Sequence, residues 1–195
     1  EDVWTPGLSV NGPMARSVPD LALLLKVQSG HDPRAPLSME AISLNVDDLL
    51  ANIKGIRIGW LGDFGGFTPC EPVVLDTCRA ALKQFEALGC VVEDAAPDMP
   101  LEPVWQALLK LRGWNAVGNL AELYNAPEKR ALLRPEAIFE IESGLKLTAF
   151  ELRAASVVRS QWYSAIRRLF ARYDILMAPG AQIMPFDARL EWPHE

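Results

Sequence analysis

Residues 55–94 restrict the possible folds of this chain more than any other stretch, because they read as a strand, a helix and a second strand. Residues 55–61 alternate apolar with polar or small side chains between bounding glycines, which is typical of a strand. A helix begins at Pro72 and ends at Gly89, and residues 90–94 form the second strand. The helix is expected to bury Val73, Val74, Cys78, Leu82, Phe85 and Leu88. This order predicts a right-handed crossover between two parallel strands.

The chain after residue 100 is predicted to be mostly helical, with a third strand at residues 175–178. Residues 101–124 form one helix or, if Gly113 and Gly118 interrupt it, two. A shorter helix follows at residues 135–143. These elements indicate an α/β fold in which helices are layered on a mainly parallel sheet of few strands.

Thr148 and Glu151 have the spacing of a capping box, which begins a long helix ending at Arg172. The expected core-facing stripe of this helix is Phe150, Ala154, Val158, Trp162, Ile166, Leu169 and Tyr173. We expect residues 1–195 to form a single α/β unit, with a connector at residues 37–54 and an irregular tail at residues 182–195.

The N-terminal region contains a loop that leads into a helix. Gly12 and Pro13 break any preceding element, and Ser17 is placed to cap a buried helix that begins at Val18 and ends before Gly30. Arg16 precedes the positive end of the helix dipole, so it is expected to be held by a carboxylate or by loop carbonyls. Gly12, Pro13, Arg16 and Ser17 are therefore interpreted as structural residues.

This loop and helix carry a resemblance to a known family. Residues 8–36 include Gly-Pro-Met-Ala-Arg-Ser-Val, then Leu-Ala-Leu-Leu-Leu and Gly-His-Asp-Pro-Arg-Ala-Pro, and this run is similar to the amidase signature family. Shorter similarities occur at residues 55–59 and 173–179. The resemblance implies a partial amidase domain within a larger α/β/α fold that cleaves carboxylic amide C–N bonds.

The same resemblance implies that the catalytic residues lie elsewhere. The family uses a Ser–cis-Ser–Lys triad, and both the lysine and the Gly-Ser-Ser-rich stretch that carries the two serines are expected upstream of the matched segment, so no Ser or Lys among residues 1–195 inherits a catalytic role. We therefore expect the chain to be inactive alone. The alternative is a non-catalytic α/β domain that binds a protein or a small molecule.

The expected substrate pocket consists of Trp114, Gly180, Ala181 and Gln182. The last three follow the third strand, and residues 178–180 are Ala-Pro-Gly where family members usually have Thr-Pro-Thr. Gly62, Gly65 and Gly66 follow the first strand, but their spacing does not match a dinucleotide-binding fingerprint, so a structural turn is favoured.

The composition of the chain limits the classes of partner that it is expected to bind. The net charge of -6 argues against nucleic acid and anionic membranes, and no apolar run approaches a membrane span. The N-terminus has no signal-peptide pattern, which leaves a cytoplasmic location as the expectation. The three cysteines and two histidines lack metal-ligand spacing, so no disulfide, metal or cofactor is expected. We expect a small amide as substrate, and a homo-oligomer that covers exposed strands, helix faces and the side chains of Trp4, Trp60 and Trp192.

Overall fold

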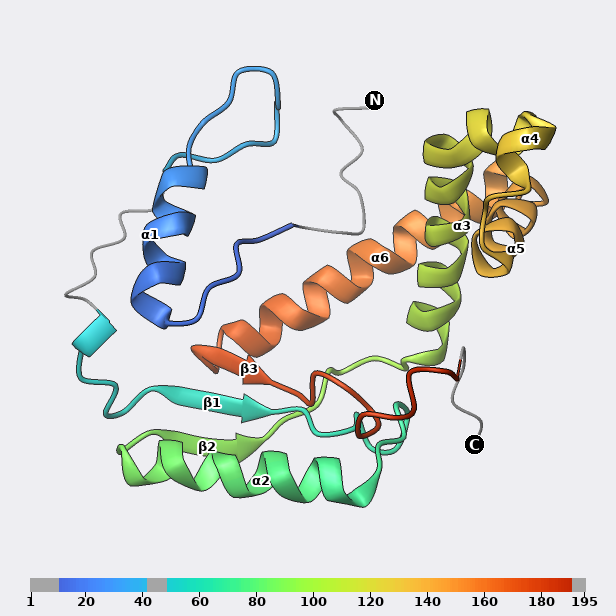
Figure 1. Cartoon of the computed structure of the whole chain (residues 1–195). Coiled ribbons are helices and arrows are strands. Elements are labelled where there is room, and N and C mark those ends of the chain that lie inside the picture. The colour runs from blue at the N-terminus through green and yellow to red at the C-terminus, as the bar shows by residue number, and fades with distance from the viewer. Residues whose placement is uncertain (1–10, 42–48, 191–195) are drawn as a thin grey trace. The chain divides into compact units, whose positions relative to one another are not determined.

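The computed structural model describes residues 11–41 and 49–190. The chain divides into two compact parts, Glu1–Asn52 and Ile53–Glu195. The first part contains α1 (Val18–Gln28). The second contains, in chain order, β1 (Arg57–Trp60), α2 (Pro72–Ala87), β2 (Val91–Asp94), α3 (Glu102–Asn125), α4 (Pro127–Arg130), α5 (Pro135–Leu145), α6 (Ala149–Phe170) and β3 (Ile175–Met177) (Figure 1).

The predicted start of α1 is confirmed. The Oγ of Ser17 accepts a hydrogen bond from the backbone N–H of Asp20 at 3.3 Å, so Ser17 is the N-cap residue. Ala22 is buried, whereas Leu23 and Val27 are 57% and 77% exposed. The apolar residues of this helix point in several directions rather than along one stripe, so a single neighbouring layer leaves many of them uncovered.

The three strands form a parallel sheet, which confirms the predicted fold class, and the structure gives their order as β2-β1-β3. The central strand β1 carries Ile58, which is 0% exposed, and Trp60, which is 4% exposed. Trp60 is thus a core residue and not part of an uncovered surface, while Trp4 and Trp192 lie outside the described residues. Figure 1 shows α2 along one side of the sheet and the C-terminal end of α6 on the other.

Helix α2 ends as its sequence predicts, at a left-handed glycine. Gly89 has a φ of 87°, and the N–H groups of Gly89 and Cys90 donate to the carbonyls of Glu86 and Phe85 at 2.9 and 3.0 Å. This pair of bonds is the Schellman motif. The predicted buried face was too wide, because Val73 is 49% exposed while Val74 is buried. Adjacent helical residues differ by about 100° in direction, so both cannot face the sheet.

Helix α3 is continuous through Gly113 and Gly118, and one of these glycines lies at a helix crossing. Gly113 faces Gly144 of α5 so closely that a Cβ built on Gly144 would overlap the Gly113 carbonyl and lie 2.8 Å from Cγ2 of Val117. A Cβ added to Gly118 would meet no atom within 4 Å. The crossing of α3 and α5 therefore depends on two glycines, whereas Gly118 is outside it.

Helix α6 packs on α3 through a stripe that differs from the predicted one. Ala155 is buried in a cluster with Ala107 and Leu111 of α3, and Val158 packs against this cluster. Phe150, expected in the core, is 89% exposed, and Ala154 is also exposed. Ala155 and Ala165 are buried although each lies one position away from the predicted stripe, whereas Leu169 and Tyr173 are buried as predicted.

The capping box at the start of α6 yields a pH prediction. Hydrogen bonds from the backbone N–H and the hydroxyl of Thr148, both 2.9 Å long, and then the ammonium of Lys110, hold the pKa of Glu151 below its usual value of 4.5. A lowered folded-state pKa adds stability above pH 4.5, and this stability is lost as the pH falls through the folded-state pKa. Glu151→Gln is therefore expected to lower the melting temperature at pH 7, and the difference from wild type should shrink below pH 4.5.

Thermal unfolding followed by circular dichroism at several pH values tests this prediction. Glu122→Gln is the matched control, since Glu122 lies on the exposed surface of α3. If the melting temperature of Glu151→Gln stays below that of wild type by the same amount from pH 7 to pH 3, the charge of Glu151 contributes nothing to stability.

Candidate functional site

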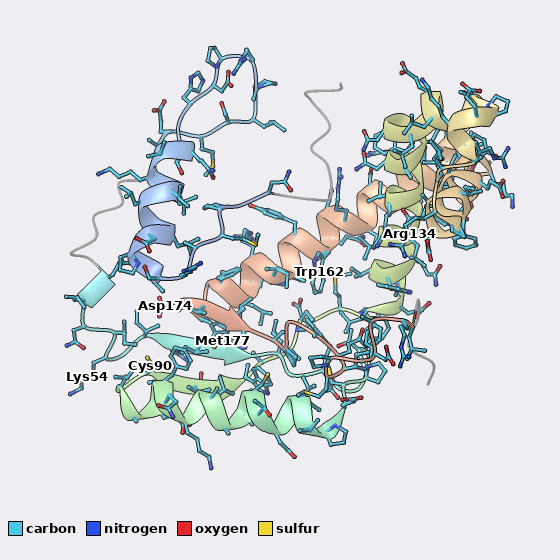
Figure 2. All side chains as sticks on the ribbon, in the orientation of Figure 1. Lys54, Cys90, Arg134, Trp162, Asp174 and Met177 are labelled. Carbon is cyan, nitrogen blue, oxygen red and sulfur yellow. The ribbon has the colours of Figure 1, made fainter. Side chains whose placement is uncertain are left out.

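The loops that follow β1 and β3 enclose a cavity of about 250 Å³ at the carboxyl end of the sheet. Figure 2 labels Met177 at the end of β3, from which the chain continues into this loop. In parallel α/β sheets, ligands bind outside the carboxyl ends of the strands. The lining residues are Gly62, Phe64, Thr68, Cys70, Ala178, Pro179, Gly180, Ala181 and Gln182.

The loop after β1 turns sharply, as its glycines predict. Gly62, Gly65 and Gly66 have φ values of 55°, 69° and 86°, which glycine adopts without a steric penalty. Phe64 has a φ of 55° and is the one residue other than glycine with positive φ in the described part of the chain. The turn therefore combines three permissive positions with one that carries backbone strain.

The loop after β3 is tied to the segment that leads into α2. The side-chain N–H of Gln182 donates to the carbonyl of Pro69 at 2.8 Å, and the carbonyl of Gln182 accepts from the N–H of Glu71 at 2.7 Å. The carboxylate of Glu71 in turn accepts from the N–H of Met184 at 3.0 Å. These bonds join residues more than 100 positions apart, and they fix one wall of the cavity.

The polar side chains in the cavity wall use their donors within the wall. The Thr68 hydroxyl donates to the carbonyl of Asp63 at 3.1 Å, and the Cys70 thiol donates to the carbonyl of Thr68 at 3.3 Å. Burial, followed by the nearby Asp63 carboxylate, raises the pKa of the Cys70 thiol. The thiol therefore stays protonated at neutral pH, which disfavours a nucleophilic role.

Three of the four residues predicted for the substrate pocket meet in this cavity. Gly180, Ala181 and Gln182 line it, whereas Trp114 lies on α3, is 38% exposed and is not among the lining residues. Trp105, which is also on α3, lines a separate groove of about 750 Å³ between α3 and α5. Neither tryptophan is a buried core residue, because α3 buries a stripe of smaller side chains against α5 and α6.

The residues predicted to be structural lie in the first part of the chain. Ser17 caps α1, and Gly12 has open space around its Cα. Arg16 is exposed, and the structure shows no ion pair or hydrogen bond between it and another described residue. The expectation that a carboxylate or loop carbonyls hold Arg16 is thus not met among residues 11–41 and 49–190.

The hydroxyls of several serines are occupied by structural hydrogen bonds. Ser17 donates to the carboxylate of Asp20, Ser29 to the carbonyl of Leu25, and Ser38 to the carbonyl of Asp32. On α6, Ser160 donates to the carbonyl of Ser156. These four side chains cap or stabilise local structure, and none of these bonds involves a lysine or a histidine.

Residues 11–41 and 49–190 contain neither a metal-binding cluster nor a membrane-spanning helix. No group of three or more His, Cys, Asp or Glu side chains in these ranges is arranged to hold a metal ion. Within the same ranges, each helix is too short or too polar to cross a lipid bilayer.

Six lining residues were missed by sequence reasoning: Ala178 and Pro179, which directly precede the predicted Gly180, and Gly62, Phe64, Thr68 and Cys70 in the loop after β1. The signal that could have found the β1 loop residues is their position directly after a strand of a mainly parallel sheet. The loops after two neighbouring parallel strands emerge at the same edge of the sheet, but the pairing of β1 with β3 that brings these two loops together is visible only in the structure.

Comparisons with known proteins agree on one family. The model of the amidase family, described as Amidase, matches residues 4–192. An acylamidase of Rhodococcus erythropolis is 28% identical over 182 residues, which are 92% of this chain and 37% of that protein. An amidase of Pseudomonas putida is 28% identical over 173 residues, or 88% of this chain and 36% of that protein. The chain thus spans well under half the length of these relatives.

Solved structures support the same assignment. The crystal structure of a bacterial aryl acylamidase of the amidase signature enzymes matches with a TM-score of 0.79 at 24% identity, over 90% of this chain and 37% of that one. With a family model covering nearly all of the residues and an amidase-signature structure sharing the fold, the chain belongs to the amidase signature family.

Proposed function

We propose that this chain forms part of a hydrolase that cleaves the C–N bond of small carboxylic amides by acyl transfer to a serine. The family membership is the observation that carries this proposal. The acylamidase and amidase relatives support an amide substrate, because their names describe enzymes that act on amides. The net charge of -6 supports a small-molecule substrate rather than nucleic acid. We also propose a cytoplasmic location.

We propose further that the triad lies outside residues 1–195 and that this chain supplies a wall of the substrate pocket. Acyl transfer needs an activated nucleophile, a base and an oxyanion hole held together. The serine hydroxyls described above are instead engaged in caps and helical hydrogen bonds. The cavity beside Gly180, Ala181 and Gln182 supports a binding role for this chain, because it lies where ligands bind parallel sheets.

The isolated chain is also proposed to self-associate. Leu23 and Val27 of α1, Phe139 of α5 and Phe150 of α6 are each more than half exposed. Apolar surfaces of this kind favour association of copies.

An assay of two proteins tests the proposed function. The purified 195-residue chain is expected to show no hydrolysis of aliphatic and aryl amides, whereas a full-length enzyme containing these residues should hydrolyse them. In that enzyme, Gln182→Ala should raise KM about tenfold, because loss of the bond to Pro69 loosens the cavity wall. Gln84→Ala is the matched control, since the exposed Gln84 side chain on α2 is away from the cavity.

Two outcomes would contradict the proposal. Turnover by the isolated chain that is lost on replacing one of its serines would place the nucleophile within it. Binding of amides by the full-length enzyme without any turnover would favour the non-catalytic binding domain instead.

A further inference from the structure

Resting on the proposed function, we propose that the cavity between the β1 and β3 loops receives a compact, uncharged substituent of the amide substrate, and that Phe64 sets the size of that substituent. The inference joins three observations on the described residues. They are the neutral wall of the cavity, the small side chains that line it together with Phe64, and the left-handed backbone of Phe64.

The wall favours an uncharged group. None of the nine lining residues carries a charged side chain. The Thr68 hydroxyl, the Cys70 thiol and one N–H of the Gln182 amide donate to loop carbonyls, which leaves the second N–H of Gln182 as the only side-chain donor among these three residues. The carboxylate of Asp63 lies close enough to raise the pKa of the Cys70 thiol, and it would repel a carboxylate in the cavity.

The size of the cavity depends mainly on one side chain. The segment after β3 contributes Ala178, Pro179, Gly180 and Ala181, all of which are small or compact. Phe64 is the one aromatic residue in the wall, and the volume is about 250 Å³. A pocket of this size accepts an aryl ring or a short branched alkyl group, and truncation of the Phe64 ring would enlarge it.

The loop keeps the backbone of Phe64 in a conformation that has a steric cost. Phe64 has a φ of 55°, a region that residues with a Cβ avoid and that its neighbours Gly65 and Gly66 adopt freely. Hydrogen bonds on both sides maintain it: the Phe64 N–H donates to the Leu61 carbonyl at 3.0 Å, and the Thr68 N–H donates to the Asp63 carbonyl at 3.0 Å. Glycine would adopt this conformation without strain, so the presence of phenylalanine here supports a role of its ring in binding.

The experiment compares substrate selectivity in a full-length enzyme that contains these residues. Acetanilide, 4-tert-butylacetanilide and 4-acetamidobenzoate vary the amine substituent, and benzamide, 4-tert-butylbenzamide and 4-carboxybenzamide vary the acyl group. In one of these series, Phe64→Ala is expected to raise kcat/KM for the tert-butyl substrate relative to the parent at least about tenfold. The kcat/KM values for the two anionic substrates, 4-acetamidobenzoate and 4-carboxybenzamide, should not rise. Phe67→Ala is the matched control, because Phe67 is 37% exposed and does not line the cavity.

Thermal unfolding gives a second readout that separates the ring from the backbone. Phe64→Gly removes both the ring and the strain, whereas Phe64→Ala removes the ring and keeps a Cβ at positive φ. Phe64→Gly should therefore melt at a higher temperature than Phe64→Ala, although both show the same change in selectivity.

The outcomes distinguish this inference from the proposed function. If the wild-type enzyme hydrolyses the amides and Phe64→Ala leaves the selectivity of both series unchanged, the inference is overturned and the proposed function stands. If no amide is hydrolysed, the proposed function fails, and titration of benzamide into the 195-residue chain by NMR decides the inference. Perturbation of the residue 62–70 and 178–182 amides by benzamide, but not by 4-carboxybenzamide, supports it; no perturbation by either compound overturns it.

Discussion

Gly144→Ala is expected to destabilise the chain by about 3 kcal/mol or more, because the new methyl group has no space at the crossing of α3 and α5. A Cβ at this position overlaps the carbonyl of Gly113 and lies 2.8 Å from Cγ2 of Val117. The obstructing carbonyl belongs to a helix backbone and cannot move without shifting α3 as a whole. The melting temperature should fall by roughly 6–12 °C, as measured by circular dichroism or calorimetry.

A glycine in the same helix pair provides the control for this result. Gly118→Ala adds the same methyl group to an exposed, open position of α3. Because alanine is the better helix former, this variant should be more stable than wild type by up to about 1 kcal/mol. Equal effects of Gly144→Ala and Gly118→Ala would show that the close crossing does not exist.

Ile58→Ala is expected to lower the free energy of unfolding by about 3 kcal/mol, which is the second largest effect we predict. Ile58 lies in the central strand β1 and is 0% exposed. Removal of most of its side chain leaves a cavity between the sheet and its covering helices, which the surrounding residues fill only in part. Equilibrium unfolding in urea measures the loss as a lower midpoint at unchanged slope.

The matched variant is the same substitution on the adjacent strand. Ile175 is paired in register with Ile58, but it lies on the edge strand β3 and is 41% exposed. Ile175→Ala should therefore cost less than half as much as Ile58→Ala. Similar losses at both positions would mean that β1 is not the buried centre of the sheet.

Local signals predicted much of the fold. Ser17 and Thr148 cap their helices where the sequence indicates, because a capping residue and its N–H donor are only three positions apart. Pro72 begins α2 and Gly89 ends it for similarly local steric reasons. The parallel pairing of β1 and β2 followed from the strand–helix–strand order, which requires no knowledge of the rest of the chain.

The errors occurred where distant segments decide the outcome. The apolar pattern of residues 150–173 allowed more than one buried stripe, and the contact of Ala155 with α3 selected a stripe that leaves Phe150 exposed. The close approach of Gly113 to Gly144, which is 31 positions away, is not implied by the sequence of α3 itself. Of the pocket residues, Gly180, Ala181 and Gln182 were anticipated, whereas the side of the cavity formed by Phe64 required the folded sheet.

The hydrogen bonds of Gln182 and Glu71 also determine when the cavity forms during synthesis. The Gln182 side chain donates a hydrogen bond to the Pro69 carbonyl, and the Met184 N–H donates one to the Glu71 carboxylate. Each bond joins residues that are 113 positions apart in the sequence. Closure of so long a loop carries an entropic cost that only the finished contacts offset. A nascent chain that has reached the end of α6 holds β1, α2 and β2 but none of the cavity wall after β3. The cavity wall therefore forms only after residue 184 has emerged from the ribosome.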